Sequence, residues 1–286
     1  MPPILDREEY IEQTYFFRTV RERMMEEHIP TQIVLASIHE EILAITRLPL
    51  AIQFLATELK HSGLLHSGFA KLPHYFAPFQ TYVIEQAEDD RNRFSIEVAF
   101  LVLEREAQYR SGTPTPQGLF VYQFETLSRN RLGYDLGLKW IQDDPFYDAD
   151  WRVFVDFVRR QVGAVDFADL LYMRSELYVS DQRRRTPDYE PPLPPLFAEK
   201  EGKIAKANRG RDPLYLFAAL QRQLAYPEVP RIKTKDDPSV KIQQLQSKVR
   251  ELEARLKLLE SEARGKVDLS EFMAKPELLT PPEDEE

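Results

Sequence analysis

The sequence predicts an all-α protein, with a multi-helix, bundle-like domain followed by a proline-rich linker and a short C-terminal coiled coil. Apolar residues recur at helical spacing through most of residues 1–180. The chain has only 10 glycines in 286 residues, too few for a protein built from many strands and tight turns. The apolar residues of 240–264 repeat in heptads, and no strand-like alternation lies between hairpin turns.

The first part of the predicted domain begins with an acidic turn and then carries three apolar stripes. Asp6 followed by Glu9 is a capping-box pattern, which predicts the start of a helix. Pro30 breaks that helix, and Pro49 suits the first turn of a later one. The stripes expected on these helices are Phe17, Val20 and Met24, then Leu35, Ile38, Ile42 and Ile45, then Ile52, Leu55 and Leu59.

The second part of the domain carries further stripes, which bring the expected number of helices to roughly eight. A run of small and proline residues at 111–116 ends one helix, and Gly163 ends another. Gly133 and Gly137 indicate a turn region, and residues 166–178 form the last predicted helix. The stripes are Ile96, Phe100, Leu103 and Ala107, then Leu119, Tyr122, Phe124 and Leu127, then Trp151, Phe154, Val155, Val158 and Val162.

Residues 181–238 form the predicted linker, which is basic and rich in proline. Three arginines at 183–185 open it, and the block Pro191–Pro195 predicts a stiff polyproline II segment. One short helix at 213–225 interrupts it, and a helix of this length is not stable alone in water. We therefore expect it to dock on the domain or on a partner. The residues of its apolar stripe are Leu216, Phe217 and Leu220.

Residues 239–265 carry the predicted coiled coil. Ile242, Val249 and Leu256 occupy one heptad position, and Leu245, Leu252 and Leu259 occupy the other. β-Branched residues at the first position with leucine at the second favour two parallel strands, so we expect a parallel homodimer. Alternatively, the helix folds back and packs its stripe on the domain. The acidic residues 266–286 are expected to be disordered.

Composition excludes several functional classes. The chain has no cysteine, which excludes disulfides, thiolate metal sites and cysteine nucleophiles. Residues 1–180 carry 27 acidic and 18 basic side chains, so nucleic acid is not an expected partner of the domain, although the basic linker leaves a weak contact open. No apolar stretch is long enough to span a membrane and the start has no signal-peptide core, so we expect a cytoplasmic protein.

One pair of residues has the spacing of metal ligands. Glu58 and His61 stand three apart, which places a carboxylate and an imidazole on one face of a helix. This spacing resembles the Glu-x-x-His pairs of ferritin-like dimetal bundles, which use two such pairs and two further glutamates. The chain has one pair. A metal site is therefore one interpretation, and two neighbouring surface side chains are the other.

A second carboxylate cluster lies at residues 143–148. Its aspartates are Asp143, Asp144 and Asp148, and the segment resembles the aspartate-rich motif of class I isoprenoid synthases. The resemblance implies an all-α enzyme that holds Mg²⁺ against a diphosphate, because hard cations bind carboxylate oxygens. The spacing and an internal proline depart from that motif. A turn with a helix-capping aspartate accounts for the same residues.

Arginine is the dominant cation of the domain, with 15 arginines against three lysines in residues 1–180. Arginine suits buried, bidentate pairing with carboxylates, so an internal polar network is the favoured interpretation. An anion or phosphate pocket is the alternative on the same geometry. The residues assigned to the network or pocket are Glu125, Arg129, Arg131, Arg174 and Glu176.

No sequence motif specifies a reaction or a cofactor. There is no glycine-rich phosphate loop, no serine nucleophile elbow and no HExxH motif. The sequence therefore favours a non-enzymatic, self-associating scaffold or adaptor that acts through an unknown protein partner. A carboxylate–metal enzyme, with Mg²⁺ or two metals inside the helical domain, is the alternative.

Overall fold

The computed structural model describes residues 5–25, 27–231 and 249. The chain divides into two compact units, Met1–Ile232 and Lys233–Glu286, and the description below concerns the first. The described residues confirm the all-α prediction, with thirteen helices and no β contact beyond two isolated bridges. The helices are α1 (Arg7–Met25), α2 (Thr31–Ile38), α3 (Leu48–Ser62), α4 (Leu65–Ala70), α5 (Pro78–Glu88), α6 (Ile96–Ser111), α7 (Pro116–Arg129), α8 (Tyr134–Gln142), α9 (Ala149–Gln161), α10 (Phe167–Met173), α11 (Glu176–Arg185), α12 (Glu199–Ala207) and α13 (Pro213–Leu224).

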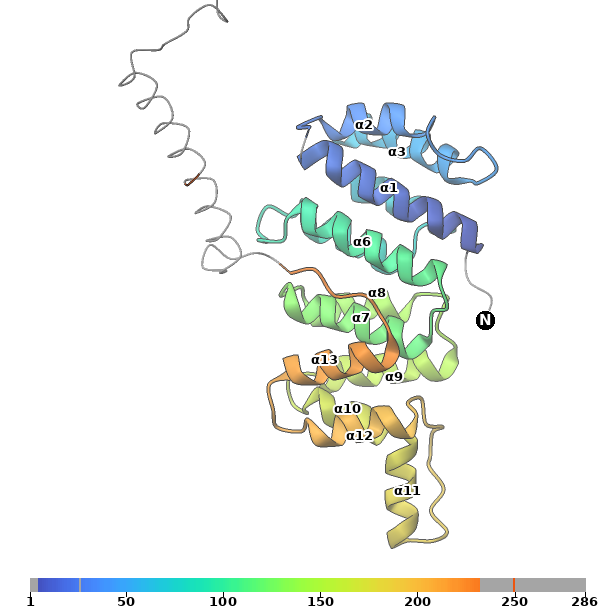
Figure 1. The fold of residues 1–286 in the computed structure, drawn as a ribbon, viewed down its shortest axis with the longest axis vertical. Helices are drawn as coiled ribbons and strands as arrows, with labels where there is room; N and C mark the ends of the chain where they lie inside the picture. The colour runs from blue at the N-terminus through green and yellow to red at the C-terminus, as the bar shows by residue number, and fades with distance from the viewer. Residues whose placement is uncertain (1–4, 26, 232–248, 250–286) are drawn as a thin grey trace, which may run out of the picture. The chain divides into compact units, whose positions relative to one another are not determined.

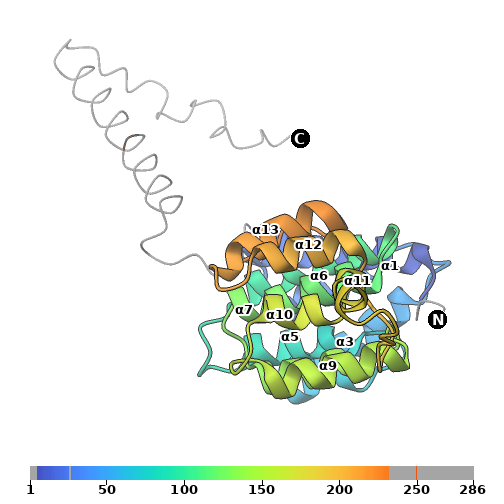
Figure 2. The same cartoon turned by 90° about the horizontal axis from the view of Figure 1, so that it is seen from below.

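The first unit is a stack of helices. α2 and α3 lie beside α1 at one end, α6 runs along α1, and α7, α13, α10 and α12 follow towards the other end (Figure 1). α8 pairs with α9 in the same part of the stack. α11 lies across the direction of its neighbours and extends from the last layer, so Figure 2 views it almost end-on. None of the described helices is long and apolar enough to cross a membrane.

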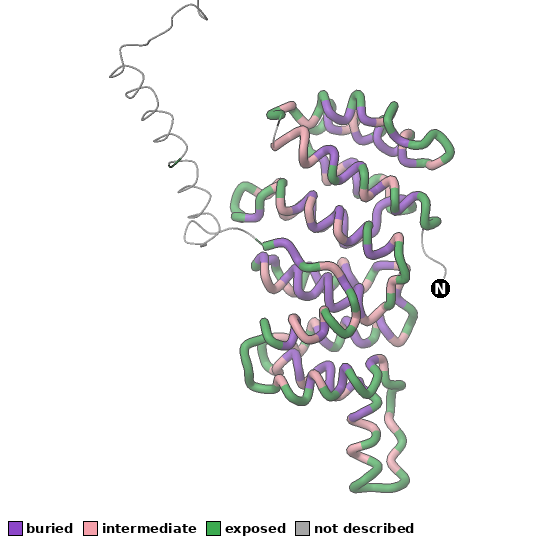
Figure 3. Tube along the Cα trace, in the orientation of Figure 1, coloured by how far each residue is buried: buried purple, intermediate pink, exposed green. Residues whose placement is uncertain are grey.

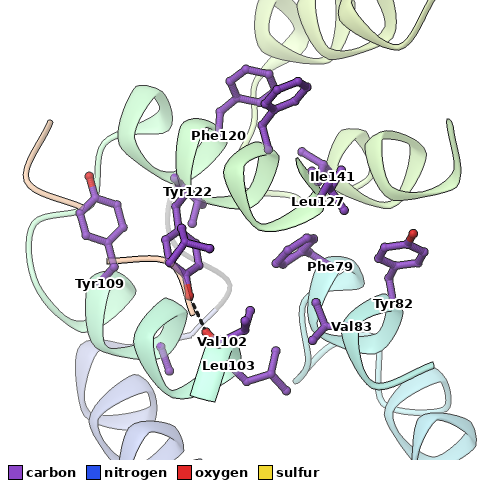
Figure 4. Packing of buried hydrophobic residues seen from close by; sticks show 14 of the residues in the cluster. Phe79, Tyr82, Val83, Val102, Leu103, Tyr109, Phe120, Tyr122, Leu127 and Ile141 are labelled. Carbon is purple, nitrogen blue, oxygen red and sulfur yellow. Dashed lines mark hydrogen bonds between the residues drawn. The ribbon is translucent and has the colours of Figure 1, made fainter. Parts of the chain in front are cut away.

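The interior between α5, α6, α7 and α8 is closely packed (Figure 4). Phe79, Leu127 and Ile141 are fully buried there. The Tyr122 hydroxyl, which is also buried, donates a 2.8 Å hydrogen bond to the carbonyl of Val102 (Figure 4). A buried hydroxyl without a partner would destabilise the unit, so this bond lets an aromatic ring fill the core without leaving a polar atom unsatisfied.

A second aromatic cluster attaches a loop to α9. Phe197, which follows α11 in the chain, packs edge-on against Trp151 and Phe154, with ring centroids 5.5 and 5.7 Å apart. Phe154 also contacts Phe120 of α7 edge-on at 5.4 Å. Such edge-to-face pairs add to the free energy gained from burial. The chain that returns from α11 is therefore fixed to the stack at Phe197.

The second predicted helix is shorter in the structure than its apolar stripe. α2 ends at Ile38, and residues 39–46 form turns instead. Ile42 is still buried, whereas Ile45 is 80% exposed. The prediction that the helix continues through the whole stripe was therefore wrong. A turn can also bury one apolar side chain against the core, so helical spacing did not show where the helix ends.

A helix replaces the turn that was predicted at the two glycines. Gly133 precedes α8, and Gly137 lies inside it. A Cβ atom at Gly137 would come within 2.6 Å of the side chain of Leu127 on α7. The glycine therefore serves the close approach of α8 to α7 and does not break the helix, which corrects the prediction.

The last predicted helix of the domain, at 166–178, is two helices in the structure. The backbone leaves the helical region at Arg174, after α10, and is extended at Ser175. Ser175 caps α11, because its Oγ accepts a hydrogen bond from the Tyr178 N–H at 3.3 Å. A serine side chain that bonds to the backbone in this way favours the start of a helix over its interior.

The compact unit extends to Ile232, beyond the expected domain boundary at residue 180. α12 packs on α10 and α11, and α13 packs on α7, α10 and α12. The stripe of Leu216, Phe217 and Leu220 on α13 is buried in the unit. Most of the segment interpreted as a linker is therefore part of the helical stack, because it too contributes apolar faces that need cover.

The centre of the unit contains a buried ionic cluster. Arg110 of α6 pairs with Glu106 at 3.0 Å and with Asp144 of the turn between α8 and α9, and all three side chains are at most 1% exposed. Gln123 of α7 donates to Glu106 at 2.8 Å and accepts a 2.8 Å hydrogen bond from the Tyr147 hydroxyl. The cluster thus joins α6, α7 and the α8–α9 turn through polar contacts inside an apolar interior.

The two carboxylates stabilise the charge on Arg110. Burial acts to lower the pKa of its guanidinium, but the charges of Asp144 and Glu106 outweigh burial and raise that pKa well above its ordinary value. Its Nε and Nη1 have no hydrogen-bond partner among the described residues. The guanidinium lies 6.0 Å from the ring centroid of Tyr10 and 5.8 Å from that of Phe146, which provides further cation–π attraction.

Replacing Arg110 by methionine is expected to reduce the free energy of unfolding by about 3–5 kcal/mol, because two buried carboxylates lose their shared cation. Urea unfolding followed by circular dichroism measures the change. The triple variant that also carries Glu106→Gln and Asp144→Asn should recover part of the loss, since no charge is then left unpaired. A loss below about 1 kcal/mol for Arg110→Met would contradict this account of the core.

Candidate functional site

The strongest candidate site is a pocket between α9, α11 and the loop that returns from α11. Its volume is about 280 Å³. Figure 3 shows exposed and partly exposed residues along most of α11 and of this loop. We call it the Arg174 pocket, after the buried cation in its lining. The residues that line it are Val153, Phe154, Phe157, Met173, Arg174, Ser175, Tyr178, Val179, Tyr189, Pro191, Pro192, Leu193 and Pro195.

Backbone hydrogen bonds fix the base of the pocket. The carbonyl of Arg174 accepts the N–H groups of Leu196 at 2.8 Å and of Phe197 at 3.1 Å. The N–H of Glu176 donates to the carbonyl of Phe197 at 2.9 Å. These bonds form where α10 ends and α11 begins, so the break between the two helices also binds the returning loop. Without that break, the carbonyl of Arg174 would be used within a helix.

α12 packs against the start of α11. Gly202 of α12 lies so close that an added Cβ would be 2.4 Å from the Ser175 Oγ and 2.8 Å from the Leu177 Cβ. Ser175 also donates from its Oγ to the carbonyl of Tyr172 at 2.7 Å. The residue that caps α11 is therefore held by contacts with α12 and with α10, so the wall of the pocket that α11 supplies has a fixed start.

Arg174 is a buried cation without an anionic contact in the described residues. Only 8% of the residue is exposed, and its Nε, Nη1 and Nη2 are buried with no hydrogen-bond partner there. Its guanidinium carbon lies 5.7 Å from the ring centroid of Phe154. Burial lowers the pKa of the guanidinium, and the charge of Asp150 opposes that shift only in part. The site therefore lacks an anion that would satisfy the guanidinium.

The rest of the pocket is apolar, and its rim is exposed. Phe154, Tyr178 and several prolines form the walls. Val153 is 50% exposed, Phe157 40% and Leu193 43%. Exposed large apolar side chains around a hollow are typical of binding sites. A guanidinium below apolar walls suits a ligand with one anionic group beside an apolar group.

The lining offers little chemistry for catalysis. Within the part of the chain that the structure describes, it includes no Asp, Glu, His or Lys. Its one serine, Ser175, has its hydroxyl engaged in the helix cap by hydrogen bonds with the carbonyl of Tyr172 and the N–H of Tyr178. A reaction that transfers a proton needs a group that can change protonation state near the operating pH.

Glu58 and His61 do not come together with further ligands. Glu58 accepts a 2.7 Å hydrogen bond from the Ser67 hydroxyl and pairs with Lys71. The hydrogen bond from Lys71, followed by that from Ser67, lowers the pKa of the Glu58 carboxyl. His61 is exposed. No group of three His, Asp or Glu side chains in the described ranges is arranged to hold a metal ion.

The three aspartates of the 143–148 segment have different surroundings and different hydrogen-bond partners. Asp143 is exposed, and Asp144 is the buried partner of Arg110. Asp148 caps α9, because its Oδ1 accepts the Trp151 N–H at 2.9 Å. Asp144 Oδ1 also accepts the N–H of Phe146 at 3.0 Å, which closes the turn. The structure thus uses two of the three carboxylates in the turn-and-cap arrangement that was the alternative to the metal motif.

The five residues assigned to one polar network do not form a single cluster, although Glu125 and Arg129 are paired. Glu125 pairs with Arg129 on the next turn of α7, and it accepts a 2.7 Å hydrogen bond from the Tyr226 hydroxyl. Arg131 is exposed, with a left-handed backbone of φ 55°. Glu176 is exposed at the start of α11. Arg174 alone lines the pocket, which corresponds to the anion-pocket alternative and not to the network.

Sequence reasoning missed the other walls of the Arg174 pocket. The proline block was interpreted as a spacer, yet Pro191, Pro192 and Pro195 line the pocket. Tyr178 and Tyr189 stand edge-on with ring centroids 6.4 Å apart at its side. The available signal was the density of aromatic and proline residues just after the arginines at 183–185, because such residues are frequent in binding surfaces.

Comparisons with protein-family models, with curated proteins and with solved structures found no match to this chain. The geometry of the Arg174 pocket therefore carries the functional argument by itself.

Replacing Arg174 by methionine is expected to raise the free energy of unfolding of the isolated protein by about 1 kcal/mol or more, because an unpaired buried charge is removed while its apolar contacts are kept. Thermal and urea unfolding measure the effect. Arg222→Met, at an exposed position on α13, is the control and should change stability by less than about 0.5 kcal/mol. A clear loss of stability on Arg174→Met would show instead that the guanidinium supports the fold.

Proposed function

We propose that this protein is a non-enzymatic, self-associating adaptor that binds a partner protein through the Arg174 pocket. The single observation that carries the proposal is the buried Arg174 guanidinium, which is unsatisfied by the described residues and belongs to a residue that lines an apolar pocket. A buried charge without a partner destabilises a fold, and the destabilisation is relieved when a ligand supplies the opposite charge. Residues kept at the expense of stability are characteristic of functional sites.

The alternative function, a carboxylate–metal enzyme inside the helical domain, has less support. The carboxylates assigned to it lie apart and have other contacts: Glu58 pairs with Lys71, Asp144 pairs with Arg110, and Asp148 caps α9. An enzyme of this class would need several of them directed at one point. A binding pocket at Arg174 requires no such rearrangement of the core.

Loss of partner proteins from a rim variant tests the binding role. Leu193→Glu places a negative charge on the apolar rim and should abolish co-purification of the partners that depend on the pocket. Leu136→Glu is the matched control, because Leu136 is a similarly exposed leucine on α8 outside the pocket. Quantitative mass spectrometry of proteins retained by each variant gives the comparison. The same retained proteins with both variants would contradict the proposal.

Self-association through the heptads is the second component of the proposed function. The heptad residues lie outside the described residues, except Val249, which is 50% exposed. The support is therefore the sequence pattern itself, with β-branched residues at one position and leucine at the other. Two copies in one assembly would present two Arg174 pockets to a partner, which raises avidity without any new contact.

Removing the residues after Pro238 is expected to convert a dimer into a monomer, because the heptad seam is then lost. Light scattering at micromolar concentration on the full chain and on the shortened chain measures both masses. Leu252→Lys in the full chain is a milder variant that introduces a charge into the seam and should have the same effect. A monomeric full chain, or a dimer that survives the truncation, would contradict dimerisation through this segment.

A further inference from the structure

We propose that the natural ligand of the Arg174 pocket is the C-terminal residue of a partner polypeptide, with its α-carboxylate paired to Arg174 and its apolar side chain held between the pocket walls. The inference rests on the proposed binding role of the pocket and specifies its ligand. Four features of the described residues support it: the charge of the site, its apolar walls, its exposed rim and the attachment of its loop.

The charge of the site fits a carboxylate. Arg174 is the only cationic side chain among the residues that line the pocket. A guanidinium presents its N–H groups as a planar fork that matches the two oxygens of a carboxylate. A phosphate carries a second charge and a third oxygen, and the lining described here has no second cation to receive them. A carboxylate, with one charge and two oxygens, leaves nothing unmatched.

The apolar walls fit a side chain next to that carboxylate. The pocket volume of about 280 Å³ is at the lower limit of sites that enclose a small ligand. Phe154 and Tyr178 supply aromatic surface, and Pro191 and Pro192 supply rigid apolar surface from the loop. The C-terminal residue of a polypeptide carries its carboxylate and its side chain on the same Cα atom, so both requirements are met over a short distance.

The exposed rim favours a polypeptide over a free acid. Val153, Phe157 and Leu193 remain 40 to 50% exposed around the opening. A small free carboxylic acid would fill the pocket and leave these side chains in water. A polypeptide enters by its last residue, and its preceding residues then cover the rim. Burial of the rim adds about 25 cal/mol for each Å² of apolar area removed from water, which a free acid does not gain.

The loop that covers the site is fixed at one end and lightly held along its length. Phe197 and Leu196 are bonded at the base, and Gln117 of α7 donates to the carbonyl of Leu196 at 2.6 Å. Further along, Arg183 donates to the carbonyl of Tyr189 at 3.2 Å through an exposed side chain. The Arg174 nitrogens are buried, so pairing with a carboxylate requires the side chains that cover them to shift.

Short peptides test the inference with the full-length protein. Peptides that end in Leu, Phe or Met are prepared as free acids and as C-terminal amides, and their affinities are measured by fluorescence anisotropy. The free acids should bind at least about tenfold more tightly than the amides, since the amide loses the charge-assisted pair with Arg174. Arg174→Gln should remove that preference, and Arg222→Gln should keep it. Circular dichroism confirms that both variants are folded.

Three outcomes overturn the inference. The first is equal binding of acids and amides to the unmodified protein, or no binding of either. The second is a preference for acids that persists in Arg174→Gln. The third is binding of octanoate or phenylpropionate as tight as that of the peptides, which identifies a free acid as the ligand. If any of these outcomes occurs but Leu193→Glu still loses its partner proteins, the adaptor proposal stands and only the ligand assignment fails. If Leu193→Glu retains the same partners as the control, the adaptor proposal itself is refuted.

Discussion

Charge compensation inside the helical stack is the constraint on which this structure depends. Arg110 lies at the meeting point of α6, α7 and the α8–α9 turn, and its charge is stable there because Glu106 and Asp144 face it. Apolar side chains alone bury helix faces in many orientations, since the hydrophobic effect is not directional. A buried ion pair with defined hydrogen bonds is directional, so these contacts select one arrangement of the helices around it.

The same constraint makes Arg174 conspicuous. Both arginines are buried, but the pKa of the Arg110 guanidinium is raised and that of the Arg174 guanidinium is lowered, because one has two carboxylates beside it and the other has only the more distant Asp150. The difference originates in the backbone. The helix is interrupted between α10 and α11, and the carbonyl of Arg174 accepts hydrogen bonds from the returning loop. The loop residues that line the pocket beside Arg174 are Tyr189, Leu193 and three prolines, and none of these carries a carboxylate.

Sequence patterns predicted the helices better than the sites, for reasons visible in particular residues. The stripes of α6 and α9 were predicted because a long amphipathic helix repeats its signal over several turns. The turn predicted at Gly137 was wrong because the sequence alone does not distinguish a glycine that permits close helix packing from one that ends a helix. The excess of arginine correctly indicated that the domain contains buried ion pairs. Their partners were not predictable, since Asp144 lies 34 residues from Arg110 in the chain.

The three walls of the Arg174 pocket differ in how freely their residues can be exchanged. α9 and α11 are tied into the stack by buried side chains and by the tight contact at Gly202. The stretch from Tyr189 to Leu193 makes few bonds to the rest of the unit, and surface loops accept substitution more readily than helices do. Under the proposed binding role, recognition is therefore separated from folding. Mutation in the loop would alter what the pocket accepts while the helices are preserved, so specificity could diverge during evolution faster than the fold that supports it.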